Sequence, residues 1–329
     1  YHEGRFYICF VANDTRKTYL YTSEKIDGPW KKQLIEGFYH DGSLLFDEDG
    51  RNYIVYGNDE IWITELNEDL TAPKKDGLHR LLVSDHKNPE LGYEGSHIQK
   101  INGYYYIFLV HSLRDRWMRT EACFYSDSLE GEFTGGDVLC DDRGYCGQGV
   151  AQGGIVDTPD GKWYAMLFQD SGAVGRIPIL LPVTWKDHFP FFGQNGHVPE
   201  EIEVHSTRPG YIYQPLVGSD DFCNGLLPRW QFNHDPDPRY YHLDALQGTY
   251  TITTREVCTE LTQAVNTLTQ RMSYPSCAAE VTVDASALKE GDVAGLCALQ
   301  SCYAAVGITK HHGKYEVLML DKKEDGILD

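Results

Sequence analysis

A repeated pattern of apolar and polar positions organises the first part of the chain. Each copy starts with a glycine typical of a turn and continues as a run of aromatic and β-branched residues, which is typical of a β-strand. The glycines recur 46, 53 and 58 residues apart. The four copies are residues 4–10 (GRFYICF), 50–56 (GRNYIVY), 103–109 (GYYYIFL) and 161–167 (GKWYAML). Each copy predicts the second strand of a β-hairpin.

The segment before three of these turns repeats as well. These segments are residues 41–46 (DGSLLF), 94–99 (EGSHIQ) and 152–157 (QGGIVD), each opening on a polar residue nine positions before the turn glycine. Units of about 50 residues with several short strands predict a β-propeller, in which the first strand of each blade lines a central axis. Asp41, Glu94 and Gln152 are therefore expected around the mouth of one funnel. An isolated Asp-Gly would indicate only a turn, but three polar residues in phase favour a site.

The first copy is incomplete, because the position nine residues before Gly4 would precede Tyr1. We therefore expect the chain to begin inside a blade, with a further blade upstream that closes the ring. After about residue 213 the repeat gives way to alternating strands separated by polar turns, which predicts a β-sandwich. The expected architecture is all-β, with a partial propeller at residues 1–213 and a partial C-terminal sandwich at residues 214–329.

The composition narrows the choice of partners. The chain has 329 residues, of which 41% are hydrophobic, and a formal net charge of −20. Such a surface repels phosphate backbones and anionic lipid, so we expect neither nucleic acid nor a membrane as partner. The nine Cys residues form an odd set without a C-x-x-C motif, which favours a reducing, cytoplasmic compartment. Because the chain is expected to begin inside a blade, the presence of a signal peptide stays open.

Two carboxylates that face one funnel suit general acid and base chemistry. Hydrolysis of a glycosidic bond needs a protonated carboxyl group for the leaving oxygen and a carboxylate that activates water or attacks directly. Burial and a neighbouring negative charge raise a carboxyl pKa and so preserve its proton near neutral pH. Phe38, Trp117 and Phe168 could stack against sugar rings. Arg176 stands alone beside an apolar strand and predicts either an internal ion pair or a ligand contact.

Several motifs in combination resemble glycoside hydrolase family 43, in particular its β-xylosidase and α-L-arabinofuranosidase branch. In the propeller they are residues 41–43 (DGS) with 49–50 (DG), 94–97 (EGSH), 152–163 (QGGIVDTPDGKW), 172–176 (GAVGR) and 181–185 (LPVTW). In the tail, residues 266–271 (NTLTQR) and 291–295 (GDVAG) resemble the concanavalin-like β-sandwich of the same enzymes. The resemblance therefore covers nearly the whole chain.

The resemblance implies a five-bladed propeller and a glycosidase that inverts anomeric configuration. It implies that Glu94 is the general acid, that Asp41 tunes the pKa of this acid, and that Arg176 contacts the sugar. Phe38, as an aromatic residue near the funnel, is a further candidate substrate contact. The resemblance places the general base, an Asp, upstream of Tyr1, roughly 6.5–9.5 Å from the acid. The implied substrates are xylan or arabinoxylan fragments, from which the enzyme would release xylose or arabinofuranose.

Gln152 departs from the family pattern, in which many members carry a His that helps to hold a central ion. No cofactor is expected to be required, but a Gln carbonyl can bind Ca²⁺, so a structural Ca²⁺ on the axis stays an alternative to a direct contact between Gln152 and the substrate. Residues 47–50 are expected to form a solvated turn. His97 follows Glu94 by three positions, and strand alternation is expected to turn it to the opposite face.

Two other classes of function remain open at this stage. The Gln at position 152 and the absent base would also fit a sugar-binding propeller without turnover. An interaction propeller for proteins is a third hypothesis, although phased carboxylates serve it poorly. The chain has no Gly-rich phosphate loop, G-x-S-x-G motif or His pair at helical spacing, which disfavours nucleotide and serine-hydrolase chemistry. The pattern does not choose between xylose and arabinose, nor does it indicate an oligomeric state.

Overall fold

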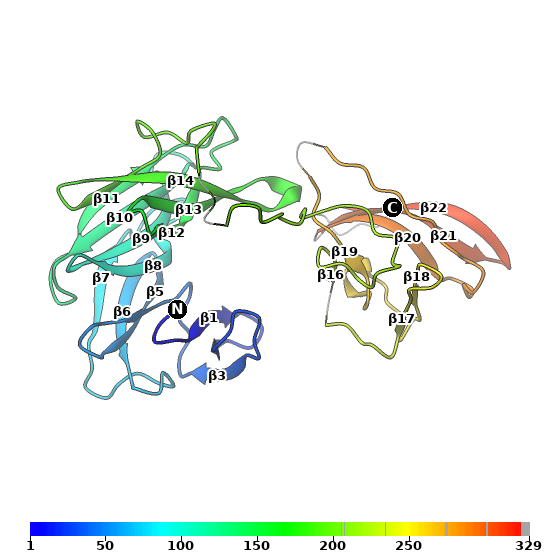
Figure 1. Cartoon of the computed structure of the whole chain (residues 1–329), viewed down its shortest axis with the longest axis horizontal. Helices are drawn as coiled ribbons and strands as arrows, with labels where there is room; N and C mark the ends of the chain where they lie inside the picture. Colours follow the sequence, from blue (N-terminus) through cyan, green and yellow to red (C-terminus); the bar gives the residue numbers. More distant parts are fainter. Residues whose placement is uncertain (205, 207, 234, 274–275, 301, 324–329) are drawn as a thin grey trace. The chain divides into compact units, whose positions relative to one another are not determined.

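The computed structural model describes residues 1–323 except 205, 207, 234, 274–275 and 301. The chain divides into two compact units, Tyr1–His205 and Ser206–Asp329 (Figure 1). This division lies eight residues before the sequence-based boundary at residue 213. The described residues between Phe192 and Gln231 hold no strand.

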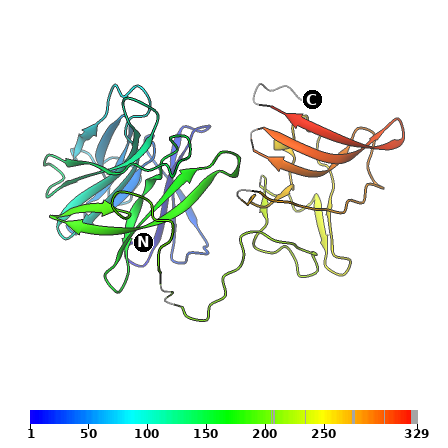
Figure 2. The same ribbon diagram turned by 90° about the horizontal axis from the view of Figure 1, so that it is seen from above.

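Four antiparallel sheets follow one another along the first unit, which Figure 2 shows from above. The first sheet contains β1 (Phe6–Ala12), β2 (Lys17–Ser23) and β3 (Lys31–Ile35). The second contains β4 (Ser43–Phe46), β5 (Asn52–Asn58), β6 (Glu60–Leu66) and β7 (His79–Ser84). The third contains β8 (Glu94–Ile101), β9 (Tyr104–Ser112), β10 (Arg119–Ser126) and β11 (Thr134–Leu139). The fourth contains β12 (Ala151–Asp157), β13 (Trp163–Asp170), β14 (Arg176–Lys186) and β15 (Phe189–Phe192).

The predicted hairpins are confirmed. The runs after the turn glycines form β1, β5, β9 and β13, and the repeated segments before the turns form β4, β8 and β12. Each of these three strands pairs antiparallel with the run that follows it and is the first strand of its sheet. In the described residues β1 has β2 as its only strand partner, and the fifth blade stays a prediction.

Apolar side chains from facing sheets pack into clusters that join each sheet to the next. Leu20 of the first sheet and Ile54 of the second share one cluster. Strand β9 is buried on both faces: Ile107 packs toward the second sheet, whereas Phe108 packs with Ile155 of the fourth. Double burial explains why this strand reads as an unbroken apolar run rather than an alternating one. Sheets stacked in this way form the predicted propeller architecture and bring β4, β8 and β12 together.

The second unit is also built from strands. Its pairs are β16 (Gln231–Phe232) with β19 (Leu268–Thr269) and β17 (Tyr241–Asp244) with β18 (Thr249–Ile252). Its largest sheet contains β20 (Val293–Leu299), β21 (Tyr303–His311) and β22 (Lys314–Lys322). The helices in the described residues are two single 3₁₀ turns, η1 (Gly172–Val174) and η2 (Leu261–Gln263). None of the described helices has the length and apolar character needed to cross a membrane.

Candidate active site

Strand β8 begins with a β-bulge that shapes the mouth of the funnel. Glu94 pairs with Val110 and His97 pairs with Phe108, so three steps along β8 face two steps along β9. Gly95 occupies the extra position with a φ of +69°, in the left-handed region that glycine adopts without a steric cost. A bulge bends its strand and changes the direction of the adjacent side chains.

Strand β12 begins with the same irregularity. Ala151 pairs with Phe168 and Gly154 pairs with Met166, which again leaves one extra residue. Here the left-handed position, with a φ of +69°, belongs to Gln152, which carries a full side chain. The backbone conformation is therefore shared with β8, whereas the chemistry placed on it differs.

The pairing register corrects the phase of the sequence repeat. The β8–β9 turn contains two residues, Asn102 and Gly103, whereas the β4–β5 and β12–β13 turns contain five, 47–51 and 158–162. Counting nine residues back from the glycine therefore misplaces Glu94 by one position. Two sets of equivalent positions result: His40, Glu94 and Ala151 in one, and Asp41, Gly95 and Gln152 in the other. All members of the second set have a positive φ.

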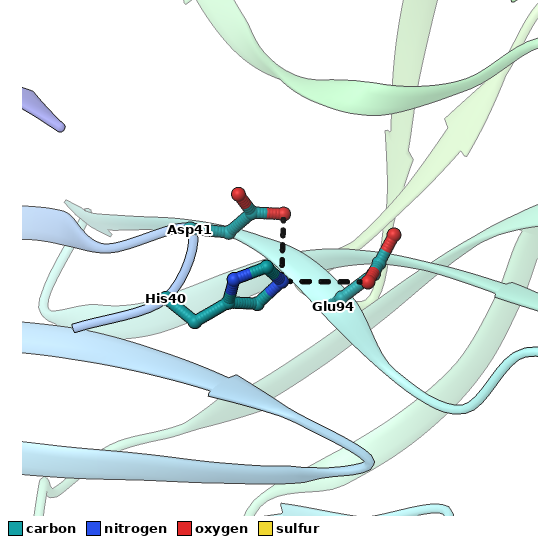
Figure 3. A group of neighbouring side chains, drawn as sticks. All are labelled: His40, Asp41 and Glu94. Atoms are coloured by element: carbon teal, nitrogen blue, oxygen red, sulfur yellow. Dashed lines mark ion pairs between the residues drawn. The ribbon is translucent and has the colours of Figure 1, made fainter. Parts of the chain in front are cut away.

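His40, Asp41 and Glu94 converge at the mouth (Figure 3). The Nε2 atom of His40 lies 3.8 Å from Oδ2 of Asp41 and 3.6 Å from Oε2 of Glu94. The side-chain amide of Asn58 donates a hydrogen bond of 3.1 Å to the same oxygen of Glu94. The structure thus brings the predicted pair Asp41 and Glu94 together and adds His40. Sequence reasoning missed His40, whose only signal was its position directly before Asp41.

The surroundings of Glu94 favour its protonated form. Burial is the largest cause that raises the pKa of Glu94, and the negative charge of Asp41 raises it further. Interactions with His40 and with the positive charge of Arg119 oppose this shift, but the pKa of Glu94 remains above its ordinary value. A carboxyl group that holds its proton closer to neutral pH is suited to act as a general acid.

Gln152 links Asp41 to a buried cation. Its Nε2 donates to Oδ2 of Asp41 at 3.4 Å, and its Oε1 accepts from Nη2 of Arg119 at 3.4 Å. The side chain lies directly over Gly95, where an added Cβ atom would meet Cγ of Gln152 at 2.6 Å. The missing side chain of Gly95 therefore makes the room that Gln152 occupies.

Two arginines enclose the ring of Phe168. The guanidinium carbons of Arg119 and Arg176 lie 4.7 Å and 4.5 Å from its centroid. Both cations pair with Asp170, Arg119 at 2.9 Å and Arg176 at 3.3 Å. The side chain of Arg119 is 5% exposed, whereas that of Arg176 is 63% exposed. Arg176 therefore forms an ion pair and still presents a cation to solvent. Sequence reasoning missed Arg119, which no motif marked.

The other predicted aromatic residues lie farther along the loops. Phe38 precedes His40 by two residues and lines a groove of about 540 Å³. The guanidinium carbon of Arg16 lies 5.6 Å from the centroid of its ring. Trp117 is 40% exposed in the loop between β9 and β10. Their predicted stacking against sugar rings stays a prediction.

The bulge at Gly95 also overturns the expectation for His97. Glu94 and His97 pair with Val110 and Phe108, which lie two residues apart on a regular strand. Residues two apart point to the same face. Because the bulge adds one residue, Glu94 and His97 share a face, and simple alternation gave the wrong result.

The donor set at the mouth fits Ca²⁺ poorly. In the described part of the chain, the group that could hold a cation is His40, Asp41 and Glu94. Calcium prefers six to eight oxygen ligands, whereas this set offers two carboxylates and a nitrogen. The carbonyl of Gln152 faces Arg119 instead. In the 47–50 turn, expected to be solvated, the carboxylate of Asp47 is buried.

Comparisons with known proteins match both units of the chain. Residues 1–190 match the family model described as Glycosyl hydrolases family 43. Residues 219–328 match the model described as Beta xylosidase C-terminal Concanavalin A-like domain. Among solved structures, a bifunctional GH43-CE protein of Bacteroides eggerthii aligns with a TM-score of 0.84 and 39% identity, covering 100% of this chain and 42% of that one.

Curated relatives extend beyond this chain. A putative beta-xylosidase of Xylanibacter ruminicola is 27% identical over 326 residues, which cover 94% of this chain and 59% of that protein. A non-reducing end alpha-L-arabinofuranosidase of Bacteroides ovatus is 24% identical over 268 residues, 75% of this chain and 49% of that protein. The chain spans 59% and 63% of the length of two beta-xylosidases that it matches.

Proposed function

The chain belongs to glycosyl hydrolases family 43, and from this membership we propose that it forms the core of an exo-acting glycosidase. The enzyme would release xylose or arabinofuranose from xylan-derived oligosaccharides or arabinoxylan side chains. Relatives named beta-xylosidase and alpha-L-arabinofuranosidase support pentose substrates. The observation that carries the proposal is the half-buried carboxyl of Glu94, whose pKa is raised beside Asp41 at the mouth.

In this mechanism Glu94 donates its proton to the glycosidic oxygen as the bond to the sugar breaks. Asp41 supplies the negative charge beside this acid, and Gln152 donates a hydrogen bond to Asp41. The charge in turn helps Glu94 to keep its proton until the leaving group needs it. A positioned general acid contributes roughly 10²–10⁴-fold to such a rate.

Water attack from the opposite side of the sugar would invert the anomeric carbon. The proposal assigns the general base to an Asp upstream of Tyr1, roughly 6.5–9.5 Å from Glu94, a separation that leaves room for the water. The exposed guanidinium of Arg176 would donate hydrogen bonds to sugar hydroxyls, and Asp170 would orient it. Gln152 and Phe38 complete the proposed substrate contacts.

A turnover assay on the full-length protein tests the proposal. We expect release of nitrophenol from 4-nitrophenyl β-xyloside or 4-nitrophenyl α-L-arabinofuranoside, and the faster of the two identifies the preferred pentose. Calorimetric titration with xylo-oligosaccharides runs beside it. Sugar binding without any turnover would reject the enzyme and favour a sugar-binding propeller.

A further inference from the structure

A carboxyl group that the proposed mechanism does not use lies beneath Gln152. Glu121 in β10 is 0% exposed. Its Oε2 accepts a hydrogen bond of 2.6 Å from the backbone N–H of Gln152, whereas its Oε1 has no partner among the described residues. Glu121 pairs with Val110, and Val110 pairs with Glu94, so the two glutamates flank one residue of β9.

The bulge in β12 explains why an acceptor is needed at this point. Gln152 lies between the paired residues Ala151 and Gly154, so β13 offers its N–H no ladder partner. A buried N–H without an acceptor is strongly unfavourable, and a left-handed φ at a residue with a side chain adds strain. The carboxyl of Glu121 satisfies the N–H and holds this conformation. In β8 the equivalent position is Gly95, which adopts it without a side chain.

The conformation of Gln152 decides where its side-chain amide points. With the backbone held, the amide crosses Gly95 and reaches Asp41 on one side and Arg119 on the other. A relaxed backbone would withdraw the Nε2 donor from Asp41. The charge of Asp41 is one of the two causes that raise the pKa of Glu94. Glu121 is thereby connected to the general acid through two intervening residues.

Glu121 is better described as a neutral acceptor than as an ion-pair partner. Two titratable groups of its own strand interact electrostatically with Glu121. The charge of Arg119 lowers the pKa of Glu121, and Glu121 raises the pKa of Cys123. From the facing strand β12 it receives only the N–H of Gln152. Arg119 is engaged by Asp170 at 2.9 Å, and burial raises the pKa of Glu121 well above its ordinary value. An ionised carboxylate enclosed with one hydrogen bond would be costly.

We propose that Glu121 is a positioning residue of the active site, which fixes the backbone of Gln152 and through it the contact with Asp41. The proposal rests on the proposed function for its kinetic consequence, but its structural consequence can be measured separately. Glu121→Leu removes the acceptor, Glu121→Asp withdraws it by one methylene, and Glu121→Gln keeps a neutral oxygen in place. Glu65→Leu is the matched control, because Glu65 is a buried carboxyl that also accepts a backbone N–H but belongs to β6.

The experiment combines kinetics of the full-length variants on nitrophenyl pentosides with their crystal structures. We expect Glu121→Leu and Glu121→Asp to lower kcat/KM at least tenfold and to break the contact between Gln152 and Asp41 in the crystal structure. Glu121→Gln should restore both to near the wild-type values. Glu65→Leu should reduce stability and leave both kcat/KM and the contact between Gln152 and Asp41 unchanged. If the leucine variant fails to fold, the aspartate and glutamine variants carry the comparison.

Two results would overturn the proposal. One is an unchanged contact between Gln152 and Asp41 in the crystal structure of Glu121→Asp. The other is a glutamine variant as impaired as the aspartate variant, because it would show that the charge rather than the acceptor matters. A wild-type protein without turnover would instead reject the proposed function, and the crystal structures would still decide the role of Glu121.

Discussion

Strands β8 and β12 start with the same bulge and use it for different purposes. In β8 the residue before the left-handed position is the acid Glu94, and the left-handed position itself is the side-chain-free Gly95. In β12 the order is reversed, because the small Ala151 comes first and Gln152 carries the functional group. The two strands are complementary: the space that one leaves empty is filled by the side chain of the other. The site therefore arises because the same backbone conformation carries different residues in the two strands.

Asp41 is the position in β4's segment that is equivalent to Gly95 and Gln152, and it also has a positive φ. Its substitution should have the largest effect on activity among the variants that test the comparison. Asp41→Asn removes the negative charge that helps to raise the pKa of Glu94, so the acid should lose its proton at lower pH. We expect activity to fall roughly a hundredfold or more and the alkaline limb of kcat/KM against pH to move to lower pH. An alkaline limb that stays in place would show that Asp41 does not tune Glu94.

Gly95→Ala makes β8 more like β12 and should have the next largest effect. The new methyl group would collide with Gln152 and displace it from Asp41, lowering kcat/KM roughly tenfold to a hundredfold. A left-handed alanine should also cost about 1 kcal/mol of stability. Gly103→Ala is the matched control, since Gly103 has a φ of +84° and open space around its Cβ position. It should lose similar stability in a denaturant titration but no activity; equal activity losses would refute the complementarity of the two strands.

Much of this site follows from the sequence, and the exceptions have physical causes. The repeat predicts the hairpins and the mouth of the funnel because alternation and turn glycines are local signals. The repeat does not predict which residues of the three inner strands are equivalent, because turn length and bulges depend on the pairing between strands. The same bulge defeats the alternation argument for His97. The sequence does not mark Arg119 and Glu121 as site residues, because both act through contacts with Gln152 of the next sheet and neither belongs to a local motif.

The smallest expected effect concerns protein stability and the buried acid Glu121, which lies in β10 and accepts the backbone N–H of Gln152 in β12. Between the ordinary glutamate pKa and the raised pKa of folded Glu121, the unfolded chain has released a proton that the folded chain retains. The stability of the wild-type protein should therefore decrease as pH rises through this range, by at most about 1.4 kcal/mol per pH unit from this group. Glu121→Gln lacks this loss, so its stability relative to wild type should increase as pH rises above the ordinary glutamate pKa. A difference independent of pH, measured by denaturant unfolding, would indicate that Glu121 is ionised and paired.

The role of Glu94 as general acid is the claim on which the comparison depends. The most direct measurement compares Glu94→Gln with wild type on two xylosides, one with a dinitrophenol leaving group and one with a second xylose. Dinitrophenol leaves with little protonic assistance, whereas a sugar alkoxide requires it. We predict a loss of roughly 10²–10⁴-fold on the disaccharide and a much smaller loss on the aryl xyloside. Equal losses on both substrates would contradict the assignment of Glu94 as the acid.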